Sequence, residues 1–84
     1  MNVLITFHSV SSALYLDKIM KDKEMECKIV PVPRALSSSC GYCAIIKGKE
    51  PAEFKEYMDL NDIEWEEIYT FGANEQYALF TVRE

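Results

Sequence analysis

The segment CKIVPVPRALSSSCGYCAIIK, residues 27–47, holds two apolar runs on either side of a segment rich in turn-forming residues. The first run, residues 27–32, predicts a strand, and Pro31 and Pro33 mark a sheet edge or the exit from the sheet. The second run, residues 42–47, predicts another strand. Because only a loop joins the two runs, we expect the second strand to return antiparallel to the first.

The residues before this segment predict a strand followed by a helix. Residues 3–7 read as a first strand, with Val3, Ile5 and Phe7 on one face. Ser9 or Ser11 can cap the helix that follows. The charged run at residues 21–24 is expected to be the solvated end of that helix. The apolar positions that keep helical spacing are Ala13, Leu14, Leu16, Ile19 and Met20.

The residues after position 47 complete the pattern. Pro51 suits the first turn of a second helix that runs to about residue 60. Residues 65–71 predict a strand, Gly72 begins a turn, and residues 77–82 predict a short last strand. The order β-α-β-β-α-β predicts an α+β fold of the ferredoxin-like split βαβ kind, an antiparallel sheet with both helices on one face. We expect one domain over residues 1–84, with residues 72–84 as a C-terminal β extension.

This topology also predicts which segments meet. Right-handed crossovers make the first two strands parallel. The end of the first strand, the start of the first helix and the loop between the second and third strands then share one edge of the sheet. We therefore expect His8, the N-terminus of the first helix and Cys40 to be neighbours.

Charge and composition exclude several function classes. The formal charge of −5 argues against a nucleic acid or an anionic membrane as partner. The N-terminus has no basic start and no segment approaches transmembrane length, so neither a signal peptide nor a membrane span is expected. Three cysteines without a disulfide spacing fit reduced thiols, and we expect a cytoplasmic location.

The loop at residues 33–43 gathers hydroxyls, backbone N–H groups, an arginine and a thiol. Cys40 is the candidate reactive residue, because a thiol beside a glycine, a helix N-terminus and a basic side chain favours the thiolate. Two alternatives stay open: Cys40 can be an inert turn residue, and Arg34 can be a surface ion-pair partner. The residues expected to stabilise a thiolate or another anion are Arg34, Ser38, Ser39, Gly41, His8 and Ser9.

Cys43 is the candidate second thiol. In an extended strand the Cα atoms of Cys40 and Cys43 would be about 10 Å apart, so a disulfide requires a turn there, which Gly41 allows. A buried place for Cys43 in the strand is the favoured interpretation. Cys27 is expected in the core. No metal site is expected, since His8 with two cysteines is an incomplete zinc ligand set.

Several of these motifs together resemble the selenium/sulfur carrier-like family. The resemblance covers about residues 2–70. It rests on Thr6-Phe7 at the end of the first strand, on serines at the start of the first helix, on PVPR at residues 31–34 and on SSSCG at residues 37–41. It implies that Cys40 is the carrier thiol, framed by Ser38, Ser39 and Gly41. Cys43 and the extension at residues 72–84 depart from the family pattern.

Three function classes follow. The leading one is a small cytosolic carrier of sulfur or selenium that attaches the atom to Cys40, works with a cysteine desulfurase or an acceptor enzyme, and has no turnover of its own. The second is a thiol–disulfide redox protein that uses Cys40 and Cys43. The third is a non-catalytic binding module on a ferredoxin-like scaffold. No cofactor is expected, and an exposed aromatic strip on the last strand would favour a homodimer through the sheet edge.

Overall fold

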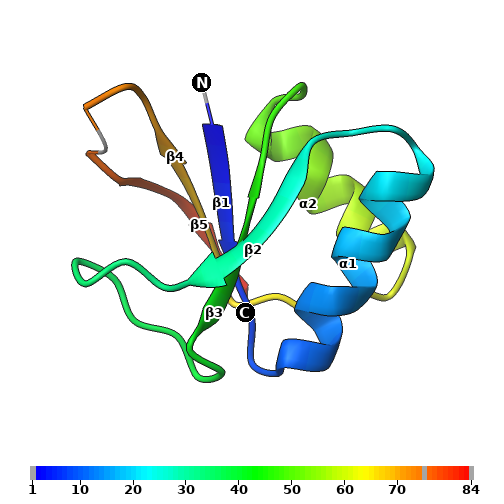
Figure 1. The fold of residues 1–84 in the computed structure, drawn as a ribbon, viewed down its shortest axis with the longest axis horizontal. Coiled ribbons are helices and arrows are strands. Elements are labelled where there is room, and N and C mark those ends of the chain that lie inside the picture. Colours follow the sequence, from blue (N-terminus) through cyan, green and yellow to red (C-terminus); the bar gives the residue numbers. More distant parts are fainter. Residues whose placement is uncertain (1, 75, 84) are drawn as a thin grey trace.

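The computed structural model describes residues 2–74 and 76–83, and its elements come in the predicted order. Figure 1 shows both helices on the same side of one sheet, so the α+β prediction is confirmed. The strands are β1 (Asn2–Thr6), β2 (Cys27–Pro31), β3 (Tyr42–Ile46), β4 (Glu67–Phe71) and β5 (Ala78–Val82). The helices are α1 (Val10–Asp22) and α2 (Pro51–Leu60).

The sheet has the order β2-β3-β1-β4-β5, and all neighbouring strands are antiparallel. Because β1 and β2 both run antiparallel to β3, they are parallel to each other, as the ferredoxin-like topology requires. The register pairs Thr6 with Cys43 on one side of β1 and Ile5 with Ile68 on the other. The C-terminal end of β1 is therefore held between the start of β3 and the start of β4.

The alternation of side chains along β1 divides the core between the two faces of the sheet. Val3, Ile5 and Phe7 belong to the large cluster under the helices, as predicted. Leu4 lies on the opposite face, in a small cluster with Cys43 and Phe71. Cys27 is buried in the helix-covered cluster, so its predicted core position is confirmed.

The first helix follows its predicted cap and pattern with one exception. Ser9 is the N-cap, and its hydroxyl accepts the Ser12 N–H at 3.4 Å. The side chains of Ala13, Leu16 and Met20 form the buried stripe. Leu14 was included in the helical spacing of the apolar positions, but it is 53% exposed. One residue further along a helix is a rotation of about 100°, which turns Leu14 away from the stripe that contains Ala13.

The fourth strand begins later than the sequence pattern predicts, at Glu67 rather than at residue 65. The Trp65 side chain is 1% exposed, and its indole N–H donates to Asp59 Oδ1 at 3.0 Å. Trp65 therefore fastens the end of α2 to the sheet instead of continuing the strand. None of the helices in residues 2–74 and 76–83 is long and apolar enough to cross a membrane.

Candidate functional site

The loop between β2 and β3, residues 32–41, is closed at its base by a hydrogen bond from the Val32 N–H to the Gly41 carbonyl (3.0 Å). The Leu36 N–H donates to the Pro33 carbonyl (2.9 Å), which makes a turn around Arg34. Gly41 has φ +79°, in the left-handed region that glycine adopts without strain. This turn at Gly41 directs the chain into β3 and sets Cys40 at the base of the loop.

The Cys40 side chain is half-buried and packs against the helix-covered cluster. Its Sγ lies 3.3 Å from the Tyr42 carbonyl oxygen, to which the S–H can donate. The Tyr42 N–H donates to the same sulfur at 3.4 Å, and Ser38 Oγ lies 3.8 Å away. A thiolate would keep the Tyr42 N–H and could accept the Ser38 hydroxyl, while it would lose the hydrogen bond to the Tyr42 carbonyl oxygen. The Tyr42 N–H and the Ser38 hydroxyl are thus two hydrogen-bond donors that could stabilise a negative charge on the Cys40 sulfur.

Ser38 links this thiol to the end of β1. Its hydroxyl lies 3.2 Å from the Phe7 carbonyl oxygen and 3.5 Å from that of Tyr42. One hydroxyl has one proton, so Ser38 can donate to only one of these oxygens or to the Cys40 sulfur at a time. The shortest distance favours Phe7. The loop was predicted to lie beside the end of β1, and the hydrogen bond from Ser38 to the Phe7 carbonyl makes this contact.

The two other thiols are in different surroundings. Cys43 is fully buried in β3, as the favoured interpretation predicts, and belongs to the cluster on the open face of the sheet. Burial raises the pKa of the Cys43 thiol to about 11, and the nearby Cys40 adds to the shift. Burial also raises the pKa of the Cys27 thiol to about 12, with a contribution from Asp17. Cys40 is thus the least buried of the three thiols.

A second polar cluster joins Ser39, His8 and Glu66. The Ser39 N–H donates to Glu66 Oε1 at 3.0 Å, and the Ser39 hydroxyl donates to Oε2 at 2.8 Å. His8 Nδ1 lies 3.3 Å from the same Oε2 and 3.4 Å from the Ser39 hydroxyl. The Glu66 side chain is 18% exposed and that of His8 is 63% exposed. Ser39 therefore holds a carboxylate of the protein itself.

The backbone of Glu66 is fixed on both sides. Its N–H donates to the Thr6 carbonyl at 2.7 Å, and its carbonyl accepts the Arg83 N–H at 2.9 Å. Sequence reasoning missed Glu66 as a member of the site. The signal lies in the register of β1 and β4: extending the pairing of Ile5 with Ile68 by two residues sets Glu66 beside Phe7, next to His8.

The remaining predicted residues lie outside the Cys40 contacts. Ser9 caps α1, and Arg34 is exposed and takes part in none of the ion pairs found among the described residues. A hollow of about 480 Å³ lies beside the Ser39 cluster, but Cys40 does not line it. The Ser39 N–H does not point to a free anion site, because it donates to Glu66 Oε1. The residues lining it are His8, Ser37, Ser38, Ser39, Glu66, Glu67, Val82 and Arg83.

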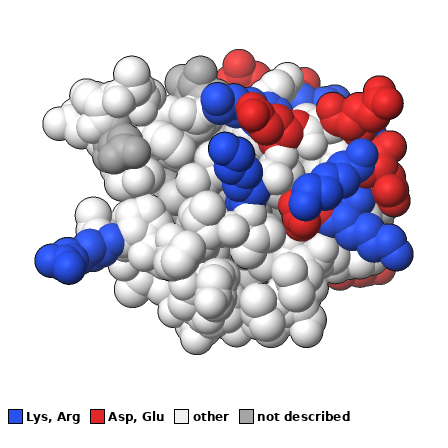
Figure 2. Space-filling model, in the orientation of Figure 1, with Lys and Arg blue, Asp and Glu red and all other residues white. Residues whose placement is uncertain are grey.

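The surroundings of Cys40 carry little charge. Residues 9–16 and 35–46 contain no Lys, Arg, Asp or Glu. In the view of Figure 2 most charged side chains lie on the right and at the upper right, and one basic side chain projects at the left edge, where the loop after β2 lies in Figure 1. The lowest part of the surface, where the start of α1 lies in Figure 1, is uncharged. No group of three His, Cys, Asp or Glu residues that could hold a metal ion occurs in residues 2–74 and 76–83.

Comparison with known proteins gives a match to a family model. The family model described as putative Se/S carrier protein-like matches residues 2–70, which is most of the chain. The matched range includes Cys40, Ser38, the Ser39 cluster and both helices, and it ends before β5. No curated protein and no solved structure shows significant similarity to the chain.

Proposed function

The chain belongs to the putative Se/S carrier protein-like family, and on this premise we propose that it carries one atom of reduced sulfur or selenium on Cys40. The atom would be held as a persulfide or a perselenide and passed to an acceptor. The observation that supports Cys40 is its combination of partial exposure with two nearby hydrogen-bond donors, the Tyr42 N–H and the Ser38 hydroxyl. The other two thiols are buried.

The loading step is a transfer between two sulfur atoms without net oxidation. The Cys40 thiolate attacks the outer sulfur of a persulfide on the donor enzyme. A bond forms between Cys40 Sγ and that sulfur, the sulfur–sulfur bond of the donor breaks, and the donor cysteine leaves as a thiolate. A cysteine desulfurase supplies such a persulfide. Delivery repeats the same step with the thiolate of an acceptor enzyme as the attacking group.

The hydrogen bonds at Cys40 suit a carrier rather than an enzyme with its own turnover. The Tyr42 N–H and the Ser38 hydroxyl can stabilise the Cys40 thiolate, which attacks the donor on loading and is released on delivery. Glu66 contributes a carboxylate on the Ser39 side of the loop, which disfavours a second anion there. Cys40 is partly exposed, which leaves access for a partner's active site. We propose that this exchange takes place in the cytoplasm.

The redox alternative has less support. A disulfide between Cys40 and Cys43 would join a thiol that packs under the helices to one buried in the cluster on the opposite face of the sheet. The raised pKa of Cys43, about 11, leaves few Cys43 thiolates at neutral pH to attack a partner. Cys43 would have to leave its cluster first, so we place thiol–disulfide exchange behind the carrier function.

The expectation of a homodimer rests on β5. This edge strand exposes Leu79, Phe80 and Val82 by 53%, 44% and 48%, and its outer backbone groups can pair with another strand. Two copies of β5 could extend the sheets across a twofold axis. Sedimentation velocity of the wild type and of Val82→Lys tests this: a dimer that the substitution dissociates supports it, and a monomeric wild type contradicts it.

The carrier function is tested by loading with a cysteine desulfurase and cysteine, followed by alkylation and peptide mass analysis. We expect the added sulfur on the Cys40 peptide in the wild type and in the control variant Cys43→Ala, and none in Cys40→Ser. Repeating the reaction with selenocysteine distinguishes the two elements. Equal loading of Cys40→Ser, or no loading of the wild type by several desulfurases, would contradict the proposal.

A further inference from the structure

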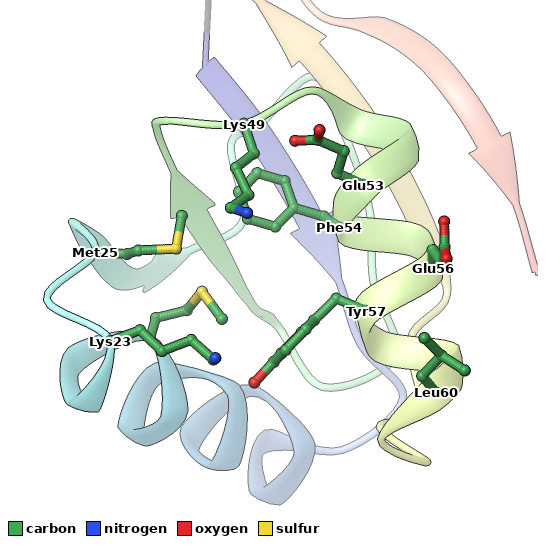
Figure 3. A pocket seen from close by; sticks show the side chains of 9 residues that line it. Lys23, Met25, Lys49, Glu53, Phe54, Glu56, Tyr57 and Leu60 are labelled. Carbon is green, nitrogen blue, oxygen red and sulfur yellow. The ribbon is translucent and has the colours of Figure 1, made fainter.

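A second concave site lies between the two helices, away from Cys40. It has a volume of about 270 Å³ and is drawn in Figure 3. The residues that line it come from the last turn of α1, from the segments that follow α1 and precede α2, and from one face of α2. The distance along the helix axis from the first residue of α1 to its C-cap is about 20 Å. This site is therefore at the other end of α1 from the Cys40 loop.

The inner wall of this site is apolar. The side chains of Met20 and Phe54 are 1% and 2% exposed and belong to the core. Met25 and Tyr57 are half-buried beside them, and Figure 3 shows Tyr57 reaching from α2 toward α1. Leu60 lines the same hollow and is 75% exposed. The flexible thioether chains of the two methionines can adapt their shape to an unbranched apolar ligand.

Two of the four charged side chains that line the site, Lys23 and Lys49, face its interior. In Figure 3 the nitrogens of Lys23 and Lys49 point into the space between the helices. Lys23 Nζ lies 5.3 Å from the centre of the Tyr57 ring, a cation–π distance. Neither lysine has an acidic partner among the ion pairs of the described residues.

Two glutamates, Glu53 and Glu56, also line the site, and their carboxylates are directed elsewhere. Glu53 accepts the Glu50 N–H with Oε2 at 3.4 Å, as part of the first turn of α2. Figure 3 shows the Glu56 side chain pointing away from the space between the helices. The hollow thus combines an apolar wall that includes two methionines with two ammonium groups at its opening.

From this combination we propose that the cleft binds a small carboxylate with an unbranched apolar chain, a medium-chain fatty acid. The chain would lie against Met20, Met25 and Phe54, and the carboxylate would accept hydrogen bonds from Lys23 and Lys49. The volume is just below the range of roughly 300–1,000 Å³ that is usual for drug-sized ligands, so the ligand is small. This binding function goes beyond the carrier proposal and does not depend on it.

The experiment is a titration with octanoate of the protein labelled with ¹³C in its methionine methyl groups. We expect the methyl resonances of Met20 and Met25 to shift with saturation, while that of Met58, which does not line the site, stays in place. Octanamide has the same chain without the charge, and we expect it to bind more weakly. Absence of Met20 and Met25 shifts, or equal affinity for octanoate and octanamide, would overturn the proposal.

Lysine variants locate the carboxylate. Lys23→Gln and Lys49→Gln should each weaken octanoate binding by about five- to tenfold, the usual effect of losing one charge-assisted hydrogen bond at a partly exposed site. Lys18→Gln is the matched control, because Lys18 is an exposed lysine of α1 that does not line the cleft. An equal loss in Lys18→Gln would show a general charge effect and would contradict the assigned site.

Discussion

Replacing Ser38 with alanine removes a side chain that joins the Cys40 loop to the end of β1. The Ser38 hydroxyl donates to the Phe7 carbonyl at 3.2 Å, and the Phe7 residue is fully buried. A neutral hydrogen bond contributes about 0.5–1.5 kcal/mol net, and a buried acceptor left without a donor costs about 1–3 kcal/mol. Because the Ser38 site is only partly buried, water can replace part of the loss. We expect Ser38→Ala to lower the free energy of unfolding by about 1–2 kcal/mol.

The adjacent serine provides a matched control. Ser37 is exposed and makes none of the side-chain hydrogen bonds found in the described part of the chain. Ser37→Ala makes the same chemical change in the same loop, so its effect should stay within about 0.5 kcal/mol.

The measurement is urea unfolding followed by fluorescence of the single tryptophan, Trp65, which is buried. Both variants should keep the wild-type dependence of the unfolding free energy on urea, since neither changes the area that unfolding exposes. If Ser38→Ala and Ser37→Ala have the same free energy of unfolding, Ser38 does not anchor the loop and the reasoning is refuted.

Three further predictions concern reactivity, backbone conformation and pH. At pH 8 iodoacetamide should alkylate Cys40 well before Cys43. The pKa of Cys43 is about 11 against a reference of 9.0, so Cys43 has about 100-fold less thiolate than an ordinary thiol. Faster labelling of Cys43, located by peptide mass, would contradict the assignment. Gly41→Ala should lower the free energy of unfolding by about 1–2 kcal/mol, because Gly41 has φ +79°, a left-handed conformation that is unfavourable for alanine. The space around an added Cβ is open, so no steric clash adds to this cost. Denaturant unfolding checks this, and an effect near zero would mean that the left-handed turn is absent. Burial and the hydrogen bond to Glu67 raise the pKa of Tyr69 to about 12. The stability that Tyr69 contributes is therefore complete below the unfolded pKa of about 10 and is lost as the pH rises toward 12. The tyrosinate absorbance that Tyr69→Phe removes should titrate near pH 12, and titration near pH 10 would show that the hydroxyl is exposed.

Periodicity and turn residues were sufficient to predict the fold. The alternation of Val3, Ile5 and Phe7 and the helical spacing of Ala13, Leu16 and Met20 mark the faces that pack together. Leu14 shows the limit of this reasoning, because its position around the helix axis decides its burial and its hydrophobicity does not. The order of the elements also predicted that the Cys40 loop would meet the end of β1.

The contacts within the site could not be predicted in the same way. The hydrogen bonds from Ser39 to Glu66 depend on the register of β1 with β4 and on the path of the loop, which the sequence pattern does not define to one residue. Ser39 was predicted to stabilise a thiolate or another anion beside Cys40, while in the structure it donates to the Glu66 carboxylate. Ser38 and Gly41 were predicted to stabilise an anion at Cys40; Ser38 Oγ lies 3.8 Å from the Cys40 sulfur, and their role stays a prediction.

The central claim is that Cys40 carries a sulfur or selenium atom, and the intact mass of the protein tests it most directly. The protein would be isolated without reductant from cells that also express a cysteine desulfurase, once as the wild type and once as Cys40→Ser. We predict a wild-type species heavier by one sulfur or selenium atom, with the addition on the Cys40 peptide and absent from the variant. A wild type without any added atom, or one lighter by two hydrogens as a disulfide of Cys40 with Cys43 requires, would contradict the account.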